Sequence, residues 1–268
     1  MTSRFVAFIG AVILVALLCA AALAPVLAPY NPTQQNLEND LAASSRDHLL
    51  GTDKLGRDLL SRILYGSRVS LSVGITTVTV SILIGLLVGS LSGYFGGWVD
   101  QLFMRLVDVL MAFPGILLAI AFTAVMGPGL DHVVLALSLI GWTGYARLVR
   151  GEILALRERE FVHAAEALGG SPARVIGLHM LPNLLPSLLI QGTFGMAAAI
   201  IAEGSLSFLG LGAQPPTPSW GSMLNEGRQF ILVAPHLTAF PGLAIMATVL
   251  GLNLLGDGLR DRLEKRGK

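Results

Sequence analysis

The stretch VSLSVGITTVTVSILIGLLVGSL, residues 69–91, contains 23 residues in a row without a charge. A helix that crosses the hydrocarbon of a bilayer needs about 20 mostly apolar residues. This run is long enough, so it predicts a membrane-spanning helix. If that prediction holds, the rest of the chain should contain further runs of the same kind.

The composition agrees with a membrane protein. Hydrophobic residues make up 53% of the 268 residues and charged residues 13%, about half the charged fraction of a soluble domain. A membrane barrel would need segments of about 10 residues with alternating polarity, whereas the apolar runs here are continuous. We therefore expect an all-α fold, a polytopic bundle of about six helices in the lipid bilayer. The expected spans are Phe5–Leu27, Val69–Leu91, Val107–Met126, Val133–Val149, Leu184–Phe208 and Leu237–Leu255.

The first span is expected to remain in the protein. Ala22-Leu23-Ala24 resembles a signal cleavage site, but the apolar run is longer than a signal core of about 7 to 15 residues, and only Arg4 precedes it. Cys19 is the single cysteine, which excludes an internal disulfide. The expected divisions are a first transmembrane helix in 1–30, an outer loop with a short interfacial helix in 31–68, a five-helix core in 69–262 and a tail in 263–268.

Charge places both termini on the cytoplasmic side. With this orientation, 12 of the 18 Lys and Arg residues fall inside, as the positive-inside rule expects. The basic residues form no continuous stripe, so nucleic acid is not an expected partner. The six departures from the rule are Arg46, Lys54, Arg57, Arg62, Arg68 and Arg228.

A polar segment, EFVHAAEALGGSPARVIGLHMLPN at residues 160–183, lies between the fourth and fifth spans. Its first helix is expected over about 158–168, where apolar residues recur at helical spacing. Gly169 and Gly170 should end this helix, because glycine adopts the left-handed conformation readily. The residues of the apolar face are Phe161, Ala164, Ala165 and Leu168.

A second short helix is expected after the glycine turn. Ser171 suits its N-cap and Pro172 its first turn, and Leu181-Pro182 should end it after about Met180. The hairpin is either a surface element at the lipid headgroups or a rigid element on which a partner docks. The outer loops leave a similar choice between receiving an external partner and plugging the outer face.

The chain lacks the common signatures of catalysis. No phosphate-binding Gly-x-x-x-x-Gly-Lys-Ser/Thr loop occurs, and His163 with Glu166 does not complete a zinc site. In Gly89–Gly93 the serines stand second and fourth, whereas a nucleophile elbow needs the third position. We expect no enzyme activity, catalytic residue, cofactor or metal in this chain. A membrane enzyme using Ser90 or Ser92, and a non-transporting receptor or scaffold, are the alternatives from other classes.

Glycines spaced by four residues give the second span a smooth stripe for close helix packing. They are Gly85, Gly89, Gly93 and Gly97.

Two carboxylates fall in or beside spans. Asp108 follows Arg105 by three residues, a spacing that permits an ion pair on a helix. Glu203, with Ser207 one turn later, is a candidate for the solute path, because carboxylates within membranes often serve there. Its depth near the outer interface equally suits a structural role.

The hairpin resembles the cytoplasmic loop of permease subunits of ATP-binding-cassette importers, whose pattern is Glu-Ala-Ala, three residues, Gly, nine residues, Ile-x-Leu-Pro. His163 and His179 depart from that pattern, which puts a specific salt bridge at position 163 in doubt. The matching residues are Ala164, Ala165, Gly169, Leu181 and Pro182.

Four longer motifs are similar to those of the C-type permease of dipeptide, oligopeptide and nickel importers. They are LGTDKLGRDLLSRILYGSRVSL (50–71), GYFGGWVDQLFMRLVDVLMAFP (93–114), SFLGLGAQPPTPSWGSML (207–224) and LNLLGDGLRD (252–261). The resemblance covers nearly the whole chain from about His48 to Asp261.

This resemblance implies the permease fold of type I importers in a bacterial inner membrane. It implies a heterodimer with a homologous permease, two cytoplasmic ATPases that hold ATP and Mg²⁺, and an extracytoplasmic binding protein. The solute would be a dipeptide, or otherwise a longer peptide or a nickel chelate. The hairpin would couple ATPase movement to the bundle through Glu160, Phe161, His163, Ala164, Ala165, Glu166, Leu168, Gly169 and Ser171.

Overall fold

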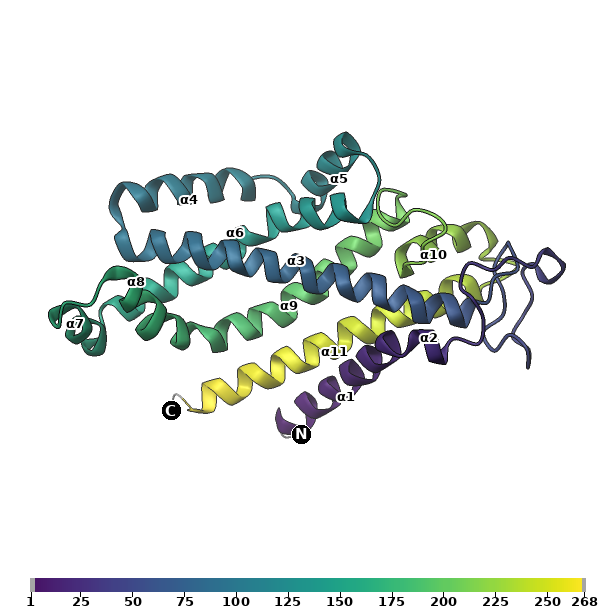
Figure 1. Cartoon of the computed structure of the whole chain (residues 1–268), viewed down its shortest axis with the longest axis horizontal. Coiled ribbons are helices and arrows are strands. Elements are labelled where there is room, and N and C mark those ends of the chain that lie inside the picture. The colour runs from purple at the N-terminus through teal and green to yellow at the C-terminus, as the bar shows by residue number, and fades with distance from the viewer. Residues whose placement is uncertain (1–2, 267–268) are drawn as a thin grey trace.

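The protein is described here as a computed structural model over residues 3–266, and every regular element in that range is a helix (Figure 1). Within these described residues, five helices are long and apolar enough to cross a membrane, and the bent pair α4–α5 would make a sixth span if it counts as one. The helices are α1 (Ser3–Ala22), α2 (Ala24–Leu27), α3 (Leu59–Phe95), α4 (Gly97–Met111), α5 (Gly115–Met126), α6 (Leu130–Arg157), α7 (Glu160–Ala167), α8 (Pro172–Arg174), α9 (Leu181–Phe208), α10 (Trp220–Gly227) and α11 (His236–Arg266).

The long helices α3, α6, α9 and α11 run along the length of the molecule (Figure 1). The helix α7 lies at one end, which we call the α7 end, and α10 lies with the loop 28–58 at the other, the α10 end. The expected tail 263–268 is partly helical, because α11 continues to Arg266. Its last two residues, 267 and 268, lie outside the described range.

The second span is longer than the sequence predicts. The helix α3 has 37 residues and begins at Leu59, so residues 59–68 belong to it and not to the outer loop. The carboxylate of Asp58 caps the helix by accepting from the Ser61 backbone N–H at 2.8 Å. At 1.5 Å per residue the helix is about 55 Å long, so it extends well beyond a hydrocarbon core of about 30 Å.

The outer loop does not contain the short interfacial helix expected there. Within the described residues 28–58, its one helical element is a 3-10 turn at Leu37–Asn39. Asp53 closes a tight turn in this loop. Its Oδ1 accepts from the backbone N–H groups of Leu55 and Arg57 at 2.9 and 3.0 Å.

The third span was predicted as one helix, Val107–Met126, and this prediction is wrong. The structure has two helices, α4 and α5, bent by 85° at a short break before Gly115. Pro114 explains the break, because proline has no backbone N–H and disfavours a helical conformation in the residue before it. An uncharged run continues across Pro114 from Val109 to Met126, so hydropathy alone does not reveal the bend.

The hairpin differs from the prediction in its second half. Leu181-Pro182 does not end the second helix, because α8 continues through a π-helical turn at Val175–Met180 into α9. The Leu181 N–H donates to the Ile176 carbonyl five residues earlier, which is the hydrogen bond of a π turn. The wider turn lets the chain pass Pro182 without a sharp stop.

Close packing of α3 on α6 forms the centre of the bundle. A Cβ on Gly85 would collide with Tyr145, one on Gly89 would lie 2.5 Å from the Ala146 carbonyl oxygen, and one on Gly93 would lie 2.9 Å from Ile153. These three glycines therefore allow the two backbones to approach closely. Gly97 does not extend the stripe, because it opens α4 with a φ of +54° and faces open space.

Candidate functional site

At the α7 end, the short helix α7 packs against the bundle with its inner side, and its outer side is exposed. Val162 is fully buried against Val175, Met180 and Leu184. Leu168, by contrast, is 89% exposed. The helix is thus anchored mainly through Val162, and it shows apolar surface outward at its C-terminal end.

Of the four residues predicted to share the apolar face, Ala165 is half-buried and packs inward. Phe161, Ala164 and Leu168 are exposed. The remaining residues assigned to this surface are also exposed: Glu160, His163, Glu166, Gly169 and Ser171.

The turn after α7 follows the sequence prediction in its glycine geometry. Gly169 has a φ of +80°, and its N–H donates to the Glu166 carbonyl at 2.9 Å. Ser171 stands in the extended N-cap conformation, although its side chain makes no capping hydrogen bond. The hairpin is closed by backbone hydrogen bonds, which makes it rigid.

One side-chain hydrogen bond fastens this hairpin to the end of α3, and another joins the ends of α3 and α6. The Tyr94 hydroxyl donates to Glu166 Oε1 at 2.8 Å, and Arg157 Nη1 donates to the Tyr94 carbonyl at 3.1 Å. Nearby, Arg150 forms two bonds of 2.5 and 2.6 Å with the carboxylate of Asp100. A displacement of α7 would therefore pull directly on the two helices that pack most closely in the bundle.

The partners of Asp108 and Ser92 differ from those that the sequence suggested. Asp108 does not pair with Arg105; its Oδ1 accepts from Arg147 Nη2 at 2.8 Å, across from α6. Ser92, considered as a possible nucleophile, donates its hydroxyl to Asp100.

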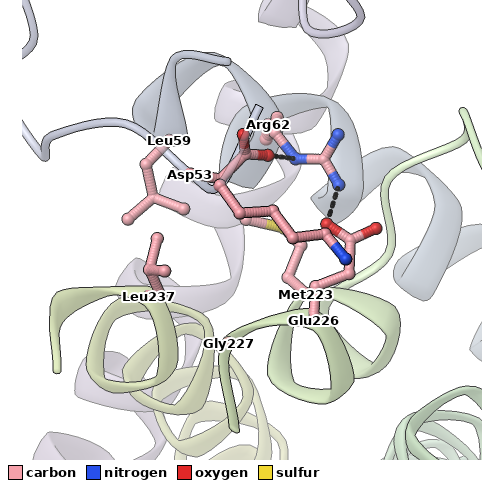
Figure 2. Close-up of a pocket in the computed structure, with 8 residues that line it drawn as sticks. Asp53, Leu59, Arg62, Met223, Glu226, Gly227 and Leu237 are labelled. Atoms are coloured by element: carbon pink, nitrogen blue, oxygen red, sulfur yellow. Dashed lines mark hydrogen bonds and ion pairs between the residues drawn. The ribbon is translucent and has the colours of Figure 1, made fainter. Parts of the chain in front are cut away.

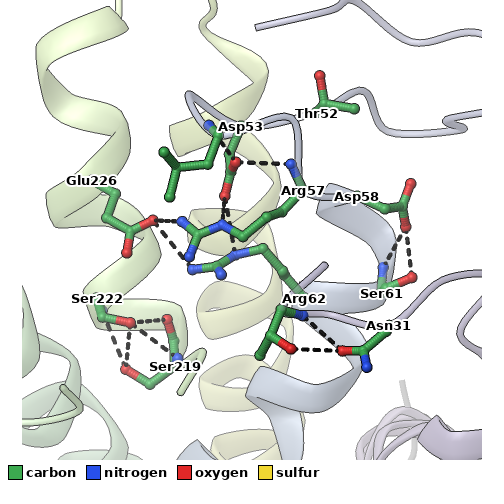
Figure 3. Close-up of polar contacts among 12 residues, drawn as sticks. Asn31, Thr52, Asp53, Arg57, Asp58, Ser61, Arg62, Ser219, Ser222 and Glu226 are labelled. Atoms are coloured by element: carbon green, nitrogen blue, oxygen red, sulfur yellow. Dashed lines mark hydrogen bonds and ion pairs between the residues drawn. The ribbon is translucent and has the colours of Figure 1, made fainter. Parts of the chain in front are cut away.

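The α10 end contains a largely buried ionic cluster made of Asp53, Arg57, Arg62 and Glu226 (Figure 3). Figure 2 shows how Arg62 lies between Asp53 and Glu226. Arg57 contacts Asp53 and Glu226 at 2.6 Å each, and Arg62 contacts the same two carboxylates at 3.4 and 3.2 Å. Arg62 is only 1% exposed. Two of the basic residues that depart from the positive-inside rule are thus neutralised by acidic partners.

The cluster joins the start of α3 to α10. Ser219 caps α10 with a capping box shared with Ser222. Trp220 is buried, and its Nε1 donates to the Ile63 carbonyl of α3 at 3.2 Å. The short helix α10 is therefore held on the bundle by both an apolar anchor and an ionic one.

Glu203 lies close to α10, and each of its two carboxylate oxygens accepts a hydrogen bond. It is 1% exposed and accepts from Ser70 at 3.1 Å and from Ser207 at 2.7 Å. The Ser207 oxygen in turn accepts from the Ala213 backbone N–H at 3.1 Å. These bonds connect α3, α9 and the loop before α10, and they place both solute-path candidates in packed surroundings.

A cavity of about 300 Å³ lies among α3, α5, α6 and α9. The sequence does not reveal this cavity, because the spacing of residues within one helix does not show which residues of different helices line the same cavity. The lining residues include Thr77, Ser81, Gly115, Tyr145, Gln191 and Gly195.

Two known family models match this sequence. The model of the binding-protein-dependent transport system inner membrane component matches residues 81–268. The model of the N-terminal TM domain of oligopeptide transport permease C matches residues 4–44.

Two curated proteins are similar over nearly the full chain. The dipeptide transport system permease protein DppC of Alkalihalophilus pseudofirmus is 44% identical, over 98% of this chain and 86% of its own length. The glutathione transport system permease protein GsiD of Escherichia coli is 45% identical, over 99% of this chain and 88% of its own length.

Among solved structures, the MetNI methionine ABC transporter in inward-facing conformations has a similar chain. It is 17% identical with a TM-score of 0.58, over 77% of this chain and 96% of that chain. A likeness at this identity shows the fold alone, and the fold is that of a type I importer permease.

Proposed function

The chain belongs to the family of binding-protein-dependent transport system inner membrane components, and on this premise we propose that it is the permease subunit of an ATP-driven importer of short peptides. Its several apolar helices agree with the multi-pass inner-membrane location of that family. Members of the family are transport subunits, and ATP hydrolysis belongs to a separate chain.

The observation that carries the proposal is the geometry of α7. A helix of eight residues stands at the end of the bundle with exposed apolar side chains. Tyr94 connects the hairpin to α3 through Glu166, and Arg157 joins the end of α6 to the same turn of α3. An isolated chain has no use for such a surface, whereas an ATPase partner would cover it. A rigid connection from that surface to the bundle is what a two-state transporter requires.

We assign the docking surface to Glu160, Phe161, His163, Ala164, Ala165, Glu166, Leu168, Gly169 and Ser171. In this assembly two ATPase subunits hold ATP and Mg²⁺, a homologous permease completes a heterodimer, and an extracytoplasmic binding protein delivers the solute. The termini and α7 face the cytoplasm, and the α10 end receives the binding protein.

Dipeptides are the solute class we propose. The relative named for dipeptide transport supports this choice. The relative named for glutathione transport is similar to the same degree, so a tripeptide is the second candidate. Longer peptides and nickel chelates are further alternatives, since the motifs of the chain resemble those of all these importers.

The first test is uptake of a radiolabelled dipeptide by the source cells with and without this gene. We expect uptake to disappear with the gene and to be inhibited by unlabelled di- and tripeptides. Chelated nickel and longer peptides serve as competitors that should have little effect. Unchanged dipeptide uptake in the deletion strain would contradict the proposed solute.

A further inference from the structure

The cavity among α3, α5, α6 and α9 lies at the middle of the three long helices. Thr77 is the nineteenth of the 37 residues of α3, and Gly144 and Gly195 are each the fifteenth of 28 residues in α6 and α9. All three residues line the cavity. Transporters commonly hold their solute at this depth, close to the bilayer midplane.

The lining is mostly apolar, with a few uncharged polar groups. Glycine and alanine residues leave much of the space, four aliphatic side chains complete the apolar part (Val78, Ile116, Leu137 and Ile140), and the polar groups are those of Thr77, Ser81, Tyr145 and Gln191. In the part of the chain that the structure describes, no charged residue lines this cavity. A solute inside it would meet hydrogen-bonding groups and helix dipoles, not an opposite charge.

The hydroxyl of Thr77 differs from those of the other buried or half-buried helical threonines in the described residues. Thr123, Thr143, Thr193 and Thr248 each donate to a carbonyl three or four residues earlier in their own helix, as buried helical threonines usually do. Thr77 is 4% exposed, yet its Oγ1 has no hydrogen-bond partner. A buried hydroxyl without a partner is costly. Among the described residues Thr77, Ser90 and Ser138 have such hydroxyls, and of these only Thr77 lines this cavity.

The break between α4 and α5 brings a helix N-terminus to the same cavity. Gly115 and Ile116, the first two residues of α5, line it, and Pro114 at the N-cap supplies no side-chain hydrogen bond. The N-terminus of a helix carries unsatisfied N–H groups and about half a positive charge. It attracts carboxylates and phosphates.

We propose that this cavity holds the peptide during translocation, and that the Thr77 hydroxyl and the N-terminus of α5 bind its terminal carboxylate. Both groups are donors, and a carboxylate offers only acceptors. This inference rests on the proposed function, because it takes a short peptide as the solute. It predicts contacts with a group that every peptide carries, so the cavity would accept many side chains.

The first experiment compares variants of the complete transporter, with its ATPases and binding protein, in proteoliposomes. Thr77→Val keeps the side-chain shape and removes the hydroxyl, and we expect dipeptide uptake at low concentration to fall about ten-fold, in line with a hydrogen bond to a charged group. Thr77→Ser should restore it. Ser90→Ala is the matched control, since Ser90 is another buried hydroxyl on α3 without a partner and should give wild-type uptake.

The second experiment measures peptide binding at this cavity without measuring transport. In a Cys19→Ser background, Thr77→Cys is labelled with a small thiol reagent in the detergent-solubilised transporter, with millimolar dipeptide or its C-terminal amide present. We expect the dipeptide to slow labelling and the amide to protect far less.

Equal protection by both peptides, or normal uptake by Thr77→Val, would overturn the carboxylate assignment. Failure of the wild-type transporter to import any dipeptide would instead overturn the proposed function. The two failures are therefore distinguishable.

Discussion

The Tyr94 hydroxyl donates a 2.8 Å hydrogen bond to the carboxylate of Glu166 and so joins the last turn of α3 to α7. The two residues are 72 positions apart in the sequence. Because α3 continues from this contact to the ionic cluster at the α10 end, one helix connects the proposed ATPase-docking surface with the opposite end of the bundle (Figure 1).

The first prediction concerns this connection. Tyr94→Phe removes the hydrogen bond and keeps the ring, so assembly should be unchanged while the amount of peptide imported per ATP hydrolysed falls about two- to five-fold. A bond of this kind contributes about 1 kcal/mol, which corresponds to that range. Simultaneous measurement of uptake and ATPase activity in proteoliposomes tests it. Tyr65→Phe, which removes a hydroxyl near the other end of α3, should leave the ratio unchanged, and an equal effect of both variants would contradict the role of Tyr94.

A second prediction isolates charge at the docking surface. Gly169 has a φ of +80°, and a Cβ there would meet open space. The energetic cost of replacing this glycine therefore comes from the backbone conformation alone. Asn and Asp both tolerate this conformation better than most residues. We therefore expect Gly169→Asn to retain most uptake, whereas Gly169→Asp, which adds a negative charge beside Glu166, should lose ATPase docking and uptake. Co-purification of the ATPase subunits measures docking; normal docking by Gly169→Asp would show that this surface is not the contact.

Much of the bundle follows from the sequence because the membrane imposes strict rules on it. Apolar runs of sufficient length predicted every long helix, and the glycines at 85, 89 and 93 predicted the close face of α3. The bend at Pro114 was missed because the uncharged run from Val109 to Met126 continues across it. Its consequence, the N-terminus of α5 at the midplane cavity, was missed with it.

The side-chain contacts across the fold could not be predicted in the same way. Arg62 and Glu226 are 164 residues apart, and no local pattern connects them. The sequence indicated only that basic residues stood on the unexpected side of the membrane. The sequence did not predict that the Thr77 hydroxyl lacks a hydrogen-bond partner, because this depends on how three helices face one another.

A third prediction compares a buried ion pair with an exposed one. Arg62→Ala leaves the buried carboxylate of Asp53 and the partly buried one of Glu226 with fewer partners, and loss of one member of a buried pair typically costs about 3–5 kcal/mol. Arg147→Ala removes a pair whose side chains are 50% and 62% exposed, which should cost less than about 1 kcal/mol. Thermal unfolding of the solubilised transporter should show a clear drop in Tm for the first variant only. Similar shifts for both would mean that the cluster does not hold α10 on the bundle.

The last prediction decides the role of Glu203. Because its carboxylate is buried and bonded to Ser70 and Ser207, Glu203→Gln should assemble normally and keep uptake within about two-fold of wild type, since the amide oxygen still accepts one of these bonds. Glu203→Leu should unfold at a lower temperature, because both hydroxyls lose their acceptor. If Glu203→Gln instead abolishes uptake while ATPase activity persists, the negative charge itself is needed. Glu203 would then belong to the solute path together with the midplane cavity.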